Sequence, residues 1–86
     1  MNLENLRKNI DDIDARLVML IGERLRVANQ IGNEKKKRNI PVDDQSREAE
    51  VIDHVCTVAQ GEGIDVEVVR KIYTLIIAGS KKVQGI

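Results

Sequence analysis

Apolar residues recur at alternating steps of three and four near the start of the chain, at Leu3, Leu6, Ile10, Ile13, Leu17 and Leu20. This spacing predicts an amphipathic helix that packs along its whole length. We expect the helix to run from residue 3 to about residue 38. Asn2 suits its N-cap, and its end is marked by the basic run 35–38 and by Pro41.

The apolar pattern of this helix is interrupted once. Its next step falls on Arg24, and the pattern resumes at Val27 and Ile31. A buried charge without a partner is costly, so we expect an anionic partner for this guanidinium. Gly22 and Gly32 lie in the same helix, and each costs roughly 1 kcal/mol relative to Ala. Each indicates close approach of another backbone or a ligand, or is a tolerated imperfection.

A second, shorter helix is predicted after the linker at residues 39–42. Asp43 or Asp44 caps it, and it runs to about Gln60, after which Gly61 and Gly63 stop it, with Gly61 as the expected C′ residue. Its inner face carries the apolar residues Val51, Val55 and Val58.

A third helix is predicted from about Val66 to the end, capped by Asp65. Its inner side is formed by Val69, Ile72, Ile76 and Val83, and is extended by Ser80 and Gln84. No stretch alternates apolar and polar residues as a strand does, so we predict an all-α fold of three helices.

The chain length predicts one domain, residues 1–86, and a partner for it. A helix of this length spans roughly 50 Å, whereas a compact globule of 86 residues has a radius of gyration of about 12 Å. The two shorter helices cannot cover both ends of the long one. We therefore expect a homodimer in which a second copy supplies the cover.

Composition excludes several classes of function. The chain has 14 basic and 14 acidic residues, whereas a general nucleic-acid binder carries a basic excess. One Cys and one His cannot form a structural zinc site or an intrachain disulfide. No apolar run suits a signal peptide or a membrane span, so we expect a cytoplasmic protein with no membrane partner.

Polar side chains interrupt the inner faces of all three helices. Arg24 and Lys35 are three turns apart on one face, with Cα atoms about 16 Å apart. The second helix adds three polar residues and the third adds two, at Asp44, Arg47, Glu48, Ser80 and Gln84. Such a pocket suits a small polyanion with a hydroxyl or ether group. It has no evident nucleophile or metal set, which matches chemistry by positioning and electrostatics.

A purely structural interpretation stays open at this point. Arg24 could form a salt bridge with Glu48, and Lys35 could be a solvated member of the basic run. Asp44 could only cap its helix, and Ser80 and Gln84 could be surface residues near a frayed end.

The order and spacing of these residues resemble the all-α chorismate mutases. The resemblance covers nearly the whole chain and rests on LRKNI at residues 6–10, Asp14, ER at 23–24, GNEK at 32–35, PV at 41–42, Asp44, RE at 47–48, II at 76–77, Ser80 and Gln84. It implies an intertwined homodimer with two equivalent sites. It also implies the Claisen rearrangement of chorismate to prephenate in aromatic amino-acid biosynthesis, in one pericyclic step with no cofactor.

The resemblance also implies roles for individual residues. Arg24 and the partner's Arg7 are expected to clamp the two substrate carboxylates, with Ser80 contacting a carboxylate. Lys35 is expected to bind a carboxylate and the ether oxygen, to which Gln84 also donates. Glu48 is expected to accept from the ring hydroxyl, supported by Asp44 and Arg47.

Two alternative functions accompany this interpretation. One is an isochorismate-pyruvate lyase on the same scaffold, although the combination of Lys35, Glu48 and Gln84 favours the mutase. The other is a non-catalytic helical dimer that uses the basic run 35–38 to bind nucleic acid or a protein. In that dimer the polar residues of the inner faces would satisfy one another.

Overall fold

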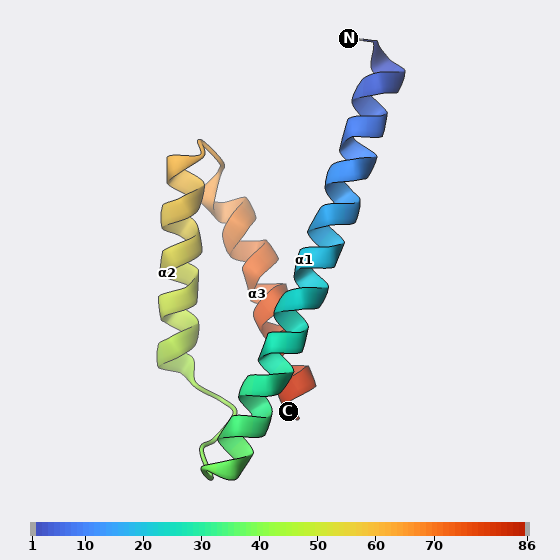
Figure 1. Cartoon of the computed structure of the whole chain (residues 1–86). Coiled ribbons are helices and arrows are strands. Elements are labelled where there is room, and N and C mark those ends of the chain that lie inside the picture. Colours follow the sequence, from blue (N-terminus) through green and yellow to red (C-terminus); the bar gives the residue numbers. More distant parts are fainter. Residues whose placement is uncertain (1, 86) are drawn as a thin grey trace.

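Three helices form the computed structural model, which describes residues 2–85: α1 (Leu3–Lys37), α2 (Gln45–Gly61) and α3 (Val66–Gln84) (Figure 1). The described residues contain no strand, so the predicted all-α fold is confirmed.

The helix α1 begins and ends close to where the sequence predicts. The Asn2 side chain accepts a hydrogen bond from the backbone N–H of Asn5 at 2.8 Å, which satisfies one of the free donors of the first turn. Arg38 is the C-cap, and Asn39 follows with φ of 55°, a left-handed conformation that Asn tolerates. A staple between Met1 and Leu6, which the sequence also predicts, involves a residue outside the described range.

The helices α2 and α3 have the predicted N-caps. The Asp44 carboxylate accepts from the backbone N–H of Arg47 at 3.0 Å, and the Asp65 carboxylate accepts from that of Glu67 at 2.9 Å. The helix α2 ends at Gly61, one residue after the predicted end at about Gln60. Gly61 is therefore helical and is not the C′ residue, and the left-handed glycine after the helix is Gly63, with φ of 70°.

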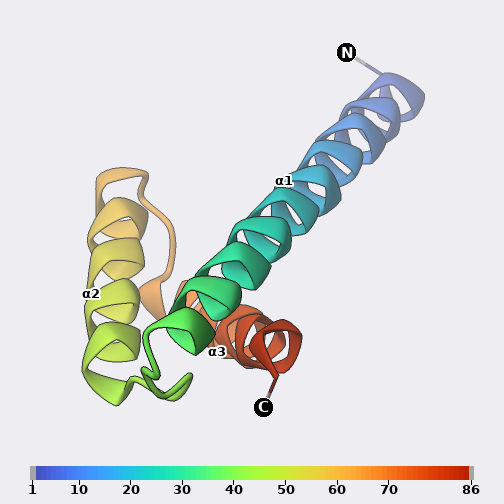
Figure 2. The same ribbon diagram turned by 60° about the horizontal axis from the view of Figure 1, so that its bottom comes forward.

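The helix α3 holds the fold together because it contacts both other helices. Within the described residues α1 and α2 each pack on α3 and not on each other, and α3 runs beside α2 and crosses the C-terminal half of α1 (Figures 1 and 2). The radius of gyration is 15.9 Å, against about 12 Å for a compact globule of this length. The molecule is therefore elongated, as the sequence predicts.

The contact between α1 and α3 is closest at Gly32. A Cβ atom at this position would lie 3.0 Å from the Cα of Gln84 and 2.9 Å from its Cγ, closer than real Cβ atoms approach. The prediction that this glycine permits a close backbone approach is confirmed. At Gly22 a Cβ would meet only the Arg26 side chain of its own helix, at 3.4 Å, so no other backbone segment of residues 2–85 approaches there.

The buried core of the chain is small. Its apolar members are Ala28, Ala59 and Ile77. The predicted inner faces of α2 and α3 are wrong at three positions that are at least 40% exposed, namely Val58, Ile72 and Val83. In α2 the turn to α3 folds over Ala59, whose carbonyl accepts from the Ile64 N–H at 2.9 Å. In α3 the buried side runs through Ile77 and Ser80, because this helix faces α1 and α2 at once.

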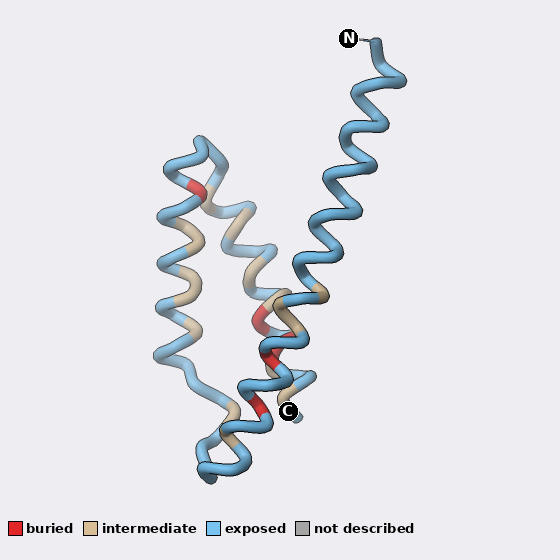
Figure 3. The backbone as a smooth tube through the Cα atoms, viewed as in Figure 1, coloured by how far each residue is buried: buried red, intermediate tan, exposed pale blue. Residues whose placement is uncertain are grey.

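The N-terminal half of α1 is not covered by the rest of the chain. Its apolar face stands in solvent over five turns, with exposed fractions between 42% and 61% at Leu3, Leu6, Ile10, Ile13, Leu17 and Leu20 (Figure 3). Contiguous apolar surface of this size typically marks an interaction site. None of the described helices has the length and apolar character needed to cross a membrane.

Candidate active site

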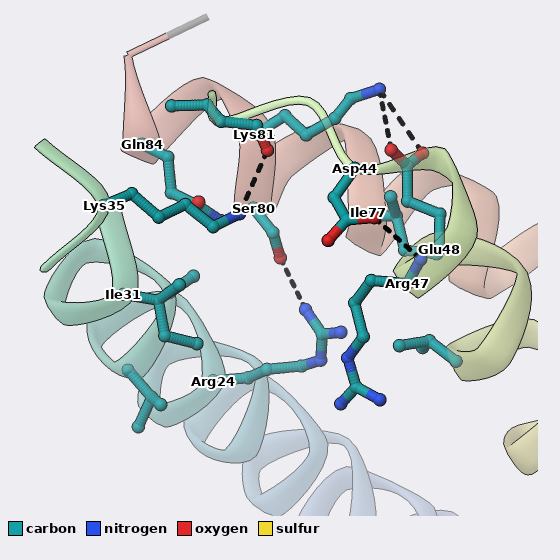
Figure 4. A pocket seen from close by; sticks show the side chains of 14 residues that line it. Arg24, Ile31, Lys35, Asp44, Arg47, Glu48, Ile77, Ser80, Lys81 and Gln84 are labelled. Atoms are coloured by element: carbon teal, nitrogen blue, oxygen red, sulfur yellow. Dashed lines mark hydrogen bonds and ion pairs between the residues drawn. The ribbon is translucent and has the colours of Figure 1, made fainter. Parts of the chain in front are cut away.

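A pocket of about 350 Å³ lies where the C-terminal half of α1, the first turns of α2 and the last turns of α3 meet (Figure 4). Seven of the eight site residues predicted from the sequence line it: Arg24, Lys35, Asp44, Arg47, Glu48, Ser80 and Gln84. Apolar side chains of α1, α2 and α3 form the rest of the wall, including Ile31, Val51 and Ile77. The eighth residue, Arg7, lies elsewhere.

Arg24 has no carboxylate partner among residues 2–85. Its guanidinium donates a hydrogen bond to the Ser80 hydroxyl (Figure 4), which in turn donates to the carbonyl of Ile76 at 3.0 Å. It also lies over the ring of Tyr73, 5.7 Å from the centroid, within cation–π range. The alternative salt bridge with Glu48 is therefore wrong, because Glu48 pairs with Lys81. The described residues do not supply the anionic partner that the sequence predicts for Arg24.

Lys35 points into the pocket from the last turn of α1. Its ammonium donates to the carbonyl of Val42 at 3.1 Å, because the linker folds back over this end of the helix. The side chain is half-buried, and no carboxylate of the described residues lies within ion-pairing distance of it. It is therefore not simply a solvated member of the basic run, and two of its three N–H donors remain available.

Gln84 enters the pocket from the last residue of α3. Its side-chain oxygen is buried and accepts no hydrogen bond from any described residue. Most buried polar atoms have a partner, so the amide has unused hydrogen-bonding capacity. The close contact with Gly32 fixes this end of α3 against α1.

Asp44 and Arg47 form the rim of the pocket on α2. Asp44 lines the pocket and also caps the helix, so the structural interpretation of this residue is confirmed alongside its place in the wall. The Arg47 guanidinium pairs with the exposed carboxylate of Glu50 at 3.3 Å. Such an exposed pair adds little stability and leaves the guanidinium free to move.

Glu48 pairs with Lys81, a residue that the sequence reasoning missed. The Lys81 ammonium lies 3.3 Å from both Glu48 carboxylate oxygens and 3.3 Å from Asp43 (Figure 4). These hydrogen bonds, to Glu48 first and then to Asp43, raise the pKa of Lys81. Helical spacing could have found it, because Ile77, Ser80, Lys81 and Gln84 share one face.

Arg7 lies far from the pocket of its own chain. It is 17 residues before Arg24 on the same helix, a separation of about 25 Å. Its guanidinium lies 3.9 Å from the Glu4 carboxylate in an exposed pair with little structural value.

The charges in the pocket favour an anionic ligand. Arg24 and Lys35 are cations without anionic partners among the described residues, while the carboxylate of Glu48 is already paired with Lys81. In a half-buried site such cations attract anions more strongly than they would in water. No group of three His, Cys, Asp or Glu side chains in the described part of the chain converges as metal ligands do.

Comparisons with known proteins point to one family. The family model described as chorismate mutase type II matches residues 6–85. The chorismate mutase of Methanocaldococcus jannaschii is 30% identical over 82 residues, which is 95% of this chain and 83% of that protein. The bifunctional chorismate mutase/prephenate dehydratase of Aquifex aeolicus is 40% identical over 53 residues, 62% of this chain but 15% of that protein.

A solved structure has the same fold. A conserved hypothetical protein from Pyrococcus furiosus superimposes with a TM-score of 0.77 and is 40% identical, covering 95% of this chain and 93% of that one.

Proposed function

The chain belongs to the chorismate mutase type II family, and we propose that it rearranges chorismate to prephenate in the pocket between its three helices. It is an isomerase of aromatic amino-acid biosynthesis. The observation that best supports this substrate is the pair of unmatched cations, Arg24 and Lys35, in a half-buried wall. A dicarboxylate would supply the anions that residues 2–85 do not provide.

The arginine and lysine side chains would act by holding the substrate. Chorismate is a flexible dianion that must adopt a compact, chair-like conformer before its C–C bond can form. In the proposed site Arg24 and the partner's Arg7 clamp the two carboxylates, with Ser80 contacting a carboxylate, and Lys35 binds a carboxylate as well. Fixing the reactive conformer in this way removes an entropic part of the barrier.

Lys35 and Gln84 would also stabilise the transition state. Negative charge grows on the ether oxygen as its C–O bond breaks, and both side chains have N–H groups in the pocket wall. Donors that meet charge only as it develops lower the barrier more than they tighten substrate binding.

Glu48 would select the substrate by accepting a hydrogen bond from its ring hydroxyl. It lies at the opposite wall from Lys35, on the first turn of α2. Asp44 and Arg47 flank it and would support this end of the substrate. A buried acceptor left without its hydroxyl would be penalised, so the contact favours substrates that carry the hydroxyl.

The active molecule would be a homodimer with two cross-chain sites. The apolar face of α1, over residues 3–20, is exposed in the single chain, and pairing of two such helices would bury it. Arg7 lies on this part of α1, about 25 Å from its own pocket. If it binds substrate, it does so in the partner's pocket.

Product identification tests the reaction. Purified protein is incubated with chorismate and, separately, with isochorismate. Prephenate formed from chorismate is the expected result, whereas pyruvate released from isochorismate would favour the lyase. If neither substrate turns over at concentrations at which the dimer forms, the non-catalytic helical dimer is the interpretation that remains.

The family and the names of the relatives favour the mutase over both alternatives. The cytoplasmic location and the absence of nucleic-acid and membrane partners remain predictions.

A further inference from the structure

Lys81 makes the only ion pairs that join different elements of the described chain. The other ion pairs of residues 2–85 link residues three or four positions apart on a single helix, with both side chains largely exposed. Lys81 instead connects α3 to Asp43 in the linker after α1 and to Glu48 in α2. Since α1 and α2 do not contact each other, this side chain ties together the three parts of the pocket rim.

The ion pair is also less exposed than the local ones. The side chains of Lys81 and Glu48 are 30% and 28% exposed, whereas those of the local pairs are between 46% and 77% exposed. Both residues line the pocket. Hydrogen bonds to Glu48 and then to Asp43 raise the pKa of Lys81, so its ammonium stays charged at physiological pH.

The donors of Lys81 are fully used within the chain. An ammonium has three N–H donors, and three carboxylate oxygens lie 3.3 Å from the nitrogen: one of Asp43 and both of Glu48. Lys35 by comparison contacts a single acceptor. The two lysines of the pocket therefore differ, because one has donors available for a ligand and the other does not.

We propose that Lys81 is a positioning residue that holds the Glu48 carboxylate in the orientation in which it accepts the ring hydroxyl of the substrate, and that neutralises this carboxylate beside a dianionic ligand. The inference rests on the proposed function of the pocket. Without Lys81, the Glu48 side chain would turn more freely and would repel the substrate carboxylates. The hydroxyl contact exists in both the ground state and the transition state, so its loss raises KM more than it lowers kcat.

Three single variants test this role. We expect Lys81→Met to raise KM for chorismate about tenfold, with kcat within about threefold of the wild type. Lys81→Arg keeps a cation that can pair with a carboxylate, and should bring KM back to within about threefold. The matched control is Lys82→Met on the next residue of α3, an exposed lysine, for which both constants should be unchanged. Equal effects of Lys81→Met and Lys82→Met would overturn the proposal.

A double-mutant cycle separates positioning from direct binding. In a Glu48→Gln background the Lys81→Met change should have less than about a twofold further effect on KM, because its target is gone. A full tenfold effect in that background would mean that Lys81 acts on the substrate itself, and would overturn the positioning role. Thermal unfolding of each variant checks that the chain is folded.

A measurement without turnover keeps the inference independent of the proposed reaction. The 13Cε signal of Lys81 should titrate at higher pH in the wild type than in Glu48→Gln, because the hydrogen bond to Glu48 raises the pKa of Lys81. If the Lys81 signal titrates at the same pH in both proteins, the ion pair is absent and the inference is wrong. If the two proteins differ as expected but the wild type forms no prephenate, the proposed reaction fails while the Lys81–Glu48 link stands.

Discussion

Gln84 packs its backbone directly against Gly32, with its Cα 3.0 Å from the place of a Cβ at that glycine. A residue of the last turn of α3 is thereby held on α1, in the pocket that Lys35 enters from the same end. We predict that Gly32→Ala displaces the last turn of α3. The clash should cost about 1–3 kcal/mol, which exceeds the gain of about 1 kcal/mol in helix propensity.

Thermal unfolding and turnover of chorismate check this prediction. The Tm and kcat of Gly32→Ala should both fall, since Gln84 moves with its helix. The matched control is Gly79→Ala in the same pair of helices, where a Cβ would meet Leu25 at an ordinary 3.8 Å. That variant should be at least as stable as the wild type, because it gains helix propensity without a clash. A Gly32→Ala chain with unchanged Tm would contradict the close approach.

A substitution of Arg24 distinguishes a substrate-binding role of this residue from a structural role. We predict that Arg24→Met lowers kcat/KM for chorismate by at least about 100-fold, the loss expected when a positioning group is removed. The free energy of unfolding should be unchanged or higher, because no carboxylate in the described chain depends on this guanidinium. Removing one partner of a true buried ion pair would instead cost about 3–5 kcal/mol. Denaturant unfolding measured beside the kinetics distinguishes the two.

Helical periodicity predicted which helix faces the polar residues occupy. Those faces meet in one pocket, which seven of the predicted residues line. Their roles remain predictions. Periodicity could not predict how each charge would be paired. Arg24 and Glu48 lie on facing helices and have opposite charges, yet the carboxylate pairs with Lys81 because α3 brings that ammonium closer. Pairing depends on distances across helices, which are set by the packing and not by the spacing within one chain segment.

The inner faces of α2 and α3 also depend on packing between helices, which the spacing of residues along the chain does not predict. The sequence predicted one inner side for each helix, which would be correct if each packed on a single neighbour. The helix α3 packs on two, so its buried side turns towards Ile77 and away from Ile72. The sequence did predict the close approach at Gly32, whereas the burial of Ala59 emerges only once the helices are placed.

The exposed apolar face of α1 predicts how the dimer can be broken. Leu17 is 53% exposed in the single chain, and we expect it to be buried against the partner. Leu17→Glu would place a charge in this interface, so it should yield monomers with little activity. Arg16→Glu on the neighbouring polar face serves as the control and should stay dimeric. Sedimentation velocity measures the association state, and a dimeric Leu17→Glu chain would contradict the proposed interface.

The Lys81 ion pairs predict a dependence of stability on pH. Its pKa is raised in the folded chain by hydrogen bonds to Glu48 and Asp43. The resulting stabilisation is therefore fully present below the unfolded pKa of about 10.4, and is lost as pH rises through the folded pKa. We expect the Tm difference between wild type and Lys81→Met to be larger at pH 8 than at about pH 11. A difference that grows with pH would have the wrong sign for these ion pairs.

The distance between Arg7 and Arg24 predicts complementation between inactive chains. The two residues are about 25 Å apart on one helix, so a single chain cannot bring both to one small substrate. Homodimers of Arg7→Ala and of Arg24→Ala should each be nearly inactive.

In a mixed dimer, one pocket combines the intact Arg24 of one chain with the intact Arg7 of the other, while the second pocket lacks both. When the two variants are unfolded together and refolded as an equal mixture, half of the dimers are mixed. About a quarter of the wild-type activity per site should therefore return, because each mixed dimer has one complete pocket. Activity no higher than that of the separate homodimers would show that each pocket is built from one chain, and Arg7 would then have no place in the site.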